Sequence, residues 1–319
     1  MVRFSLGAVG NDSFYHTPPV TSRQPSPTLP VVREPAPDVV DFYDRHPINE
    51  TQVLEAARAR AAGLGPLRPE DLWQWDQDHY GGLPAVEALA RRAAIGPGMA
   101  VLDVCAGLGG PARVLAYRFG ARVTGVDLTH SRCAAGARLT ALVRLGPLVR
   151  HVRGDAQALP FRARAFDAAV SQEGLLHVPD KAAVLAECAR VLKPGARIAF
   201  TDWIARPRLE DNERRRLFDW MAAVSLQGVD GYRGLLARAG FEGIAAEDLS
   251  PEWIGILQER LRMYRSLREQ TVARLGPARY DEYNQLYAFF VGLVEAGKLG
   301  GARFSAAAGR APSGGPSAP

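Results

Sequence analysis

The stretch MAVLDVCAGLGGPAR, from Met99 to Arg113, decides the fold. Its apolar first half (100–104) predicts a short buried strand, and its glycines predict a turn that a ligand can approach closely. Pro111 suits the start of a helix, because the N–H group that proline lacks would be unpaired there. A strand that passes through a glycine turn into a helix presents the free N–H groups of that helix to the ligand.

A second apolar strand is predicted over 121–126, and it ends in Asp127. This carboxylate follows Gly107 by twenty residues, a separation that suits hydrogen bonds to the two hydroxyls of a ribose. The two strands therefore indicate a nucleoside-containing cofactor. The spacing of Gly107, Gly109 and Ala112 also satisfies the dinucleotide fingerprint, which leaves NAD open at this point.

The composition is that of a globular protein. Of the 319 residues, 47% are hydrophobic and 23% are charged, and the net charge of +5 comes from scattered arginines rather than from a basic patch. No nucleic-acid partner is expected, and no apolar run is long enough for a membrane span or a secretory signal. Three cysteines are too few for a disulfide framework or a zinc site, which favours a reducing, cytoplasmic environment. The oligomeric state stays open, a homodimer included.

The alternation of strand and helix patterns from Met99 onward predicts an α/β fold built on a doubly wound, mostly parallel, seven-stranded sheet. The expected strands are 99–104, 121–126, 148–153, 166–171, 196–202, 242–248 and 300–306, and the expected helices include 111–119, 130–145, 181–192 and 208–227.

The domain organisation is predicted from composition and periodicity. We expect a disordered Pro-rich leader (1–38), a helical N-terminal lid segment (39–95), a cofactor-binding core (96–249), a helical cap insert (250–298), a last strand (299–308) and a disordered tail (309–319).

Four motifs in order carry a family resemblance: VLDVCAGLGG, GVDLT, GDAQALPF and VLKPG. The chain from Leu83 to Ile204 resembles the class I S-adenosylmethionine-dependent methyltransferases. The segments SQEGLLHVPD and QDHYGG look most like the small-molecule branch, which includes sarcosine and dimethylglycine N-methyltransferases and related amine and sterol enzymes. The resemblance implies a Rossmann-like methyltransferase fold with S-adenosyl-L-methionine as the cofactor.

The resemblance also implies a set of cofactor contacts. Gly107 and Gly109 would pass close to the methionine part of the cofactor, and Asp103 would organise their loop. Asp127 would bind the ribose, and Leu128 would lie against the adenine. Asp155 and Ala156 would hold the adenine amino edge, and Gln172 would contact the cofactor from the end of the fourth strand. Cys105 departs from the family, which usually has its first glycine there. A side chain is tolerable at that position if φ is negative.

Methyl transfer from a sulfonium is an in-line displacement that needs positioning and desolvation of the acceptor, and no metal is expected. Glu173 and His177 follow the fourth strand. Glu173 could serve as a base or as the charge partner of a cationic amine, or it could hold a neighbouring N–H. His177 could accept a proton or hydrogen-bond the substrate, or it could cap the helix predicted at 181–192.

His79 and Tyr80 are the other catalytic candidates, because their aromatic loop could fold over the site as a lid. Trp73, Trp75 and Tyr80 could enclose an alkylammonium by cation–π attraction, although hydrophobic packing is the favoured interpretation of Trp73 and Trp75.

The favoured interpretation is methyl transfer to a small molecule at an amine nitrogen. The alternatives are S-methylation of a thiol or sulfide, C-methylation with a true base, an NAD-dependent oxidoreductase and a non-catalytic cofactor-binding protein.

Overall fold

The computed structural model describes residues 39–44, 48–60, 66–77 and 79–309. The predicted leader, and all of the predicted tail except Gly309, lie outside these residues. None of the helices described is long and apolar enough to cross a membrane.

The described residues form one seven-stranded sheet in the order β3-β2-β1-β4-β5-β7-β6. All neighbouring strands are parallel except β7, which runs antiparallel to β5 and β6. The predicted doubly wound, mostly parallel sheet is therefore confirmed. The strands are β1 (Ala100–Val104), β2 (Arg122–Asp127), β3 (Val149–Arg153), β4 (Phe166–Gln172), β5 (Leu192–Ala205), β6 (Phe241–Asp248) and β7 (Leu299–Ala308).

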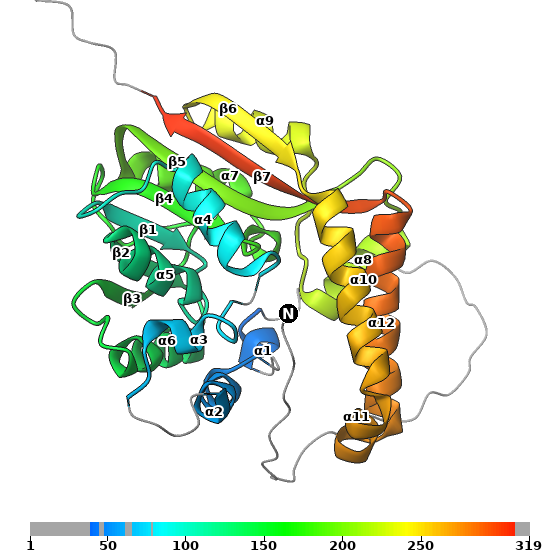
Figure 1. Ribbon diagram of the computed structural model, residues 1–319. Coiled ribbons are helices and arrows are strands. Elements are labelled where there is room, and N and C mark those ends of the chain that lie inside the picture. The colour runs from blue at the N-terminus through cyan, green and yellow to red at the C-terminus, as the bar shows by residue number, and fades with distance from the viewer. Residues whose placement is uncertain (1–38, 45–47, 61–65, 78, 310–319) are drawn as a thin grey trace, which may run out of the picture.

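Helices cover both faces of the sheet (Figure 1). Successive strand residues point to opposite faces, and both faces carry apolar side chains that the helices bury. Val101 packs in a core with α4 (Gly82–Arg92), α5 (Gly110–Phe119) and α6 (His130–Leu142). Leu102 packs in the core of the other face, with α7 (Lys181–Val191) and α9 (Val229–Arg238). Asp103 shares the first face with Val101, and this places a carboxylate beneath α5.

Three of the described helices precede α4: α1 (Val39–Asp44), α2 (Glu50–Arg60) and α3 (Pro69–Leu72). The buried Arg132 of α6 ties this region down, since its guanidinium donates to the carbonyl oxygens of Ile48 at 2.7 Å and Tyr43 at 3.0 Å. The guanidinium also lies 4.9 Å from the centre of the Tyr43 ring. One arginine thus holds α1 against the carboxyl side of the sheet.

Three helices lie between β6 and β7: α10 (Ser250–Ser266), α11 (Arg268–Leu275) and α12 (Pro277–Glu295). The helices α10 and α12 run side by side and extend away from the sheet (Figure 1). The buried Trp253 of α10 lies against β7, where a Cβ on Gly301 would come within 2.3 Å of the indole ring. Only glycine therefore allows this helix to approach the strand so closely.

The helix predicted at 208–227 is shorter than expected, which corrects the sequence interpretation. Helix α8 spans Asp211–Met221 and ends at Ala222, whose φ is +48°. The next residues form no regular structure until Gln227, which is bridged to Ile204. Contacts from distant residues hold this segment, because the carbonyl oxygen of Ser225 accepts a hydrogen bond from Lys181 Nζ at 2.5 Å.

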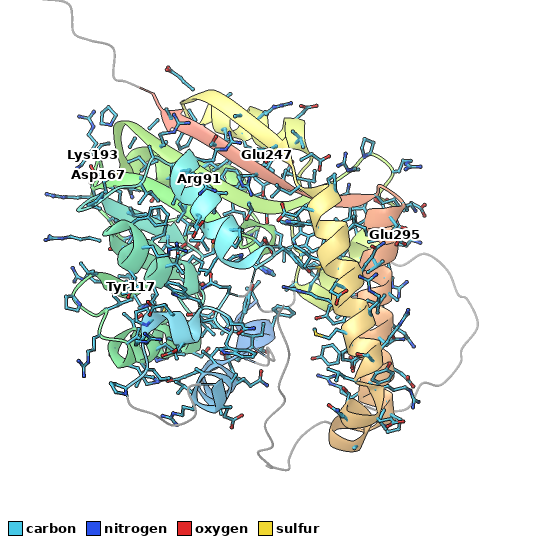
Figure 2. The ribbon with its side chains drawn as sticks, viewed as in Figure 1. Arg91, Tyr117, Asp167, Lys193, Glu247 and Glu295 are labelled. Carbon is cyan, nitrogen blue, oxygen red and sulfur yellow. The ribbon has the colours of Figure 1, made fainter. Side chains whose placement is uncertain are left out.

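The amino ends of the strands are held together by a structural ion pair. Lys193 Nζ donates to Asp167 Oδ1 at 2.5 Å (Figure 2), and the Ala100 N–H donates to Asp167 Oδ2 at 2.9 Å. Ligands of open parallel sheets bind at the carboxyl ends of the strands, so the candidate site lies at the opposite edge.

Candidate functional site

The turn after β1 has an unusual backbone. Gly107 and Gly109 have φ values of +53° and +73°, and Cys105 has a φ of +58°. A side chain at position 105 was expected to require a negative φ, and this expectation is wrong, because Cys105 has a side chain and a positive φ. A left-handed non-glycine residue costs about 1–3 kcal/mol, and such strain gathers at functional sites.

A second strained turn lies beside the first, after β4. Glu173 has a φ of +52°, and a Cβ on Gly174 would come within 2.5 Å of the Cys105 Cβ. The strands β1 and β4 are neighbours, so the two strained turns pack together at the carboxyl edge of the sheet. This junction is where the strand order reverses, the usual ligand site of an open α/β sheet.

Asp127 is built into the first turn. Its Oδ2 accepts a hydrogen bond from the Gly107 N–H at 2.8 Å, and its Oδ1 accepts one from the Thr129 N–H at 2.9 Å. Burial raises the pKa of Asp127, while these two bonds act to lower it. Each carboxylate oxygen keeps a second acceptor position for a ligand. The side chain of Leu128, which follows at once, is 46% exposed and offers an apolar surface beside the carboxylate.

Asp103 and Gln172 carry oxygens that need a donor. They project from one face of neighbouring strands, since Asp103 pairs with Val170, two residues before Gln172. Asp103 Oδ2 and Gln172 Oε1 are buried, and neither has a hydrogen-bond partner among the described residues. Burial and the nearby charge of Asp127 raise the pKa of Asp103 to about 7, against the lowering effect of Arg113. Two buried acceptors without donors fit a site that a cationic or N–H-bearing ligand completes.

Asp155 and Ala156 follow β3 at the same edge. Asp155 is exposed, and its Oδ1 accepts a hydrogen bond from the Gln157 N–H at 2.8 Å, so the carboxylate closes its own turn. Ala156 is buried in the core. Their contact with an adenine stays a prediction.

Glycine is present at positions 107 and 109 of the turn for different physical reasons. A Cβ on Gly107 would meet nothing within 4 Å, whereas a Cβ on Gly109 would lie 2.3 Å from the His151 ring. Packing against His151 therefore accounts for glycine at 109. At 107, the open space beside the backbone leaves room for a ligand to approach.

This difference gives a matched pair of variants. Gly107→Ala should cost about 1 kcal/mol of stability from its positive φ, yet weaken cofactor binding by tenfold or more if the cofactor lies against that backbone. Gly109→Ala should cost about 2–3 kcal/mol, because the imidazole must move. Urea denaturation and titration calorimetry measure the two effects; equal cofactor affinity in wild type and Gly107→Ala would remove Gly107 from the site.

Glu173 holds the loop that carries Tyr80. The Tyr80 N–H donates to both carboxylate oxygens of Glu173, at 3.0 and 3.2 Å. Of the alternatives weighed for Glu173, the structure shows the one in which its carboxylate holds a backbone N–H group, and that group belongs to Tyr80, 93 residues earlier in the chain. Because each carboxylate oxygen has further lone pairs, this bond leaves a role toward a cationic ligand available.

His177 joins two distant segments. Its Nδ1 lies 3.0 Å from the Ala222 carbonyl oxygen, which can only accept, so Nδ1 carries the proton. Nε2 then accepts from the Tyr43 hydroxyl at 2.8 Å. The alternative that His177 caps α7 is wrong, because Asp180 caps that helix by accepting from the Ala183 N–H. Its imidazole holds α1 over the carboxyl edge of the sheet.

The packing favoured for Trp73 and Trp75 is confirmed, and the alternative in which these two rings enclose an alkylammonium with Tyr80 is wrong. Trp73 lies against Tyr117, with 5.9 Å between ring centres, and belongs with Trp75 to the packing around α4 and α5. Tyr80 instead packs between other aromatic rings, 5.5 Å from that of Trp203 and 4.9 Å from that of Trp253. The Arg260 guanidinium of α10 lies 4.5 Å from the centre of the Tyr80 ring.

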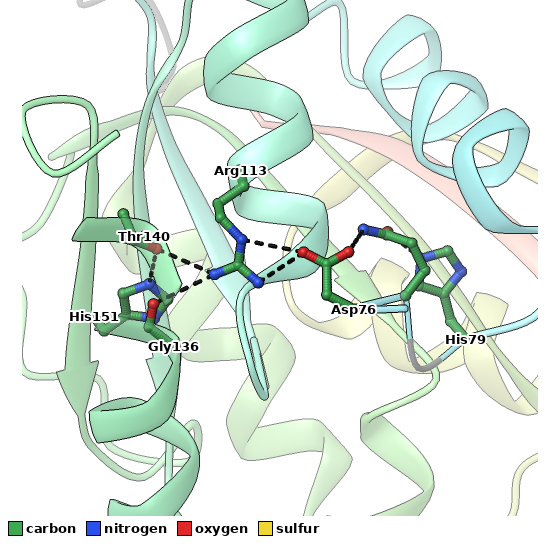
Figure 3. Close-up of polar contacts among 7 residues, drawn as sticks. Asp76, His79, Arg113, Gly136, Thr140 and His151 are labelled. Atoms are coloured by element: carbon green, nitrogen blue, oxygen red, sulfur yellow. Dashed lines mark hydrogen bonds and ion pairs between the residues drawn. The ribbon is translucent and has the colours of Figure 1, made fainter. Parts of the chain in front are cut away.

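Sequence reasoning missed a buried ion pair next to the site (Figure 3). Arg113 donates to Asp76 Oδ2 through Nε at 3.1 Å and through a terminal nitrogen at 2.8 Å. Arg113 also donates to Thr140 Oγ1, which contacts His151 Nε2 at 2.9 Å. Burial and Arg113 lower the pKa of His151 to about 4, so this imidazole is neutral. No local pattern distinguished Asp76 from its polar neighbours in the loop.

Comparisons with known proteins point to one enzyme family. Residues 102–200 match the family described as a methyltransferase domain. A glycine/sarcosine/dimethylglycine N-methyltransferase of Actinopolyspora halophila is 34% identical over 188 residues, which make up 59% of this chain and 33% of that protein. A sterol 24-C-methyltransferase of Gibberella zeae is 34% identical over 170 residues, 51% of this chain and 44% of that protein.

Among solved structures, phosphoethanolamine N-methyltransferase 2 of Haemonchus contortus superimposes with a TM-score of 0.71 at 21% identity. The match covers 86% of this chain and 60% of that one, and it is a likeness of fold. The chain thus spans a third to less than a half of the length of the two curated relatives.

Proposed function

We propose that this chain, whose residues 102–200 match a methyltransferase domain, transfers a methyl group from S-adenosyl-L-methionine to a small molecule, at an amine nitrogen. The observation that carries the proposal is the pair of buried, unpartnered oxygens of Asp103 and Gln172 beside the strained glycine turn. A turn of this kind beside an aspartate at the end of β2 suits a nucleoside that also bears an ammonium group.

The residues present fit this cofactor. Asp127 would accept from the ribose hydroxyls, the exposed side chain of Leu128 would cover the adenine, and Asp103 would pair with the ammonium group of the methionine part. Gly107 leaves space for close approach to the backbone. The cofactor, when bound, supplies an electrophilic methyl group on its sulfonium.

The chain's own residues would position the acceptor and exclude water. Glu173 brings a carboxylate to the carboxyl end of β4, where it could stabilise the positive charge that methylation of a neutral amine creates on the nitrogen. Tyr80 and α1 would close over the site, held by Glu173 and His177 respectively. Since an in-line displacement gains most from orientation and desolvation, these contacts are enough for an amine that arrives unprotonated.

Methylation of carbon is the second candidate, and the sterol 24-C-methyltransferase relative favours it. That chemistry must remove a proton from the acceptor, so it needs a base. His177 is poorly suited to the task, because Nδ1 carries a proton and Nε2 already accepts from Tyr43. Glu173 would then be the base.

The test has two stages. Titration calorimetry should first show binding of S-adenosylmethionine and no binding of NAD. Purified protein with radiolabelled cofactor should then be incubated separately with sarcosine, dimethylglycine, phosphoethanolamine, a small thiol and a sterol, and the labelled product identified by mass spectrometry. Label in an amine supports the proposal. Failure to bind the cofactor, or label only in the thiol or sterol, contradicts it.

Asp103 makes the cofactor affinity depend on pH. Its pKa of about 7 means that the carboxylate is mostly protonated near pH 6, where it attracts an ammonium group weakly. Affinity for S-adenosylmethionine should therefore rise about tenfold between about pH 5.5 and about pH 7.5 as Asp103 ionises. The raised pKa of Asp103 has the opposite effect on the stability of the protein without cofactor. The folded state binds the proton more tightly than the unfolded state, so the free energy of unfolding falls as pH rises from the unfolded pKa of 3.8 to the folded pKa of about 7.

Asp103→Asn should remove the rise in affinity, because an amide does not titrate in this range. Calorimetry across the pH range measures it for both proteins. A rise of the same size in the variant would assign the titration to another group.

A further inference from the structure

A chain of buried and half-buried polar groups leads from the Asp76–Arg113 pair to the candidate site. Gln77 Nε2 lies 2.7 Å from Asp76 Oδ1, and Gln77 Oε1 lies 2.9 Å from His79 Nε2. His79 Nδ1 in turn lies 3.1 Å from Gln172 Nε2. Asp76, Arg113 and His79 are all buried. The chain thus joins helix α5, the loop before α4 and the end of β4.

The donors and acceptors along this chain have one consistent direction. Arg113 has only donors, so both of its bonds require Asp76 as an acceptor. The remaining carboxylate oxygen must also accept, which turns the amide nitrogen of Gln77 toward Asp76 and its oxygen toward His79. That oxygen can only accept from His79 Nε2, so Nε2 carries the proton.

The same logic fixes Gln172. In a neutral imidazole with its one proton on Nε2, Nδ1 is an acceptor, and the amide nitrogen of Gln172 must face it. Gln172 Oε1 is then left as an acceptor, buried and without a partner among the described residues. A buried acceptor without a donor costs about 1–3 kcal/mol, so it is rarely kept without a purpose.

An alternative arrangement lies within reach. His79 Nδ1 is also 3.1 Å from the Tyr80 carbonyl oxygen, to which it could donate if it carried the proton. In that tautomer Nδ1 would no longer accept from Gln172, whose amide would lose its orientation. Gln77 is the group that excludes this arrangement, because its oxygen demands a proton on Nε2.

We propose that the chain Asp76–Gln77–His79 is a positioning device that fixes the amide oxygen of Gln172 as an acceptor for an N–H group of a bound ligand. This inference rests on the proposed function. The N–H group comes either from the ammonium of the cofactor or from the amine acceptor. Gln77 and His79 act through Gln172 and are positioning residues.

The matched variants are Gln77→Met and Gln172→Met, singly and together. Gln77→Met removes the link to His79 but keeps the ion pair of Asp76 with Arg113. Gln258→Met is the control, because it removes a similar side-chain bond, to Glu295, on the helices α10 and α12. Each protein is assayed for S-adenosylmethionine affinity by calorimetry, and for kcat and KM with the amine that the wild type methylates best.

Each single variant should lose about tenfold in one ligand parameter, the size of one hydrogen bond to a charged or polar group. If the cofactor supplies the N–H group, its Kd rises; if the acceptor does, the acceptor KM rises or kcat falls while the Kd stays. The double variant should lose no more than Gln172→Met alone, because Gln77 acts through Gln172. The control should match the wild type.

Nitrogen-15 NMR of the histidine ring gives a readout independent of turnover. His79 should show the Nε2–H tautomer in the wild type and in Gln172→Met, and a mixture with the Nδ1–H tautomer in Gln77→Met. An Nδ1–H tautomer or a doubly protonated ring in the wild type, or additive losses in the double variant, would overturn the inference. So would wild-type values for both single variants. Failure of the proposed function looks different, since the wild type itself would then bind no S-adenosylmethionine.

Discussion

Replacing Asp127 by alanine is expected to weaken the affinity for S-adenosylmethionine by about 100-fold. Two effects add. The ribose hydroxyls would lose a charged acceptor, and the Gly107 N–H would lose the 2.8 Å bond that shapes the turn beside the cofactor. Titration calorimetry measures the loss, and circular dichroism checks that the variant keeps its fold.

Two further variants separate these effects. Asp127→Asn keeps one oxygen acceptor and should lose less affinity than alanine. Asp180→Ala removes a carboxylate that caps α7 away from the turn, so it should cost about 1 kcal/mol of stability and leave the affinity unchanged. An Asp127→Ala protein that binds the cofactor as tightly as the wild type would refute the ribose assignment.

Breaking the buried ion pair should have the largest effect on stability. Arg113→Met is expected to lower the free energy of unfolding by about 3–5 kcal/mol, because Asp76 would remain as an uncompensated buried carboxylate. Both side chains of the pair are fully buried, at 2.8 Å from each other. The Thr140 hydroxyl and the Gly136 carbonyl oxygen would also lose a donor. Urea denaturation monitored by tryptophan fluorescence gives the difference.

The double variant Arg113→Met with Asp76→Leu tests the reason for that loss. Removing both charges leaves no unpaired carboxylate, so the double variant should recover a large part of the stability lost by Arg113→Met. A double variant as unstable as the single one would show that packing around Arg113, rather than the unpaired charge, is responsible. A loss below about 1 kcal/mol in the single variant would contradict the buried pair itself.

The sequence was a good guide where function depends on neighbours in the chain. The glycine turn, the aspartate at the end of β2 and the residues after β4 were predicted at the carboxyl edge, where the structure has them. The sequence was a poor guide to which side chains hydrogen-bond to each other. His177 was weighed as a cap of the following helix, yet its ring bonds to Tyr43, 134 residues away, and to Ala222, 45 residues away.

Backbone strain was likewise not readable from the sequence. Cys105 has a positive φ, and its side chain packs against Gly174, which lies 69 residues later in the chain. The presence of a cysteine in the sequence does not by itself indicate whether φ is positive or negative. Asp76 looked like one polar residue among several in its loop, and only the burial of Arg113 makes it the partner of a charge.

The sequence by itself determined the doubly wound sheet and the edge at which a nucleoside would bind. Strand period, turn glycines and strand-end carboxylates act over a few consecutive residues, so they can be read along the chain. The tertiary structure alone decided which groups meet: Asp76 with Arg113, Tyr80 with Glu173, and His79 with Gln172. Such pairs depend on where loops far apart in the chain are brought by packing, and on the low tolerance of buried polar groups for a missing partner.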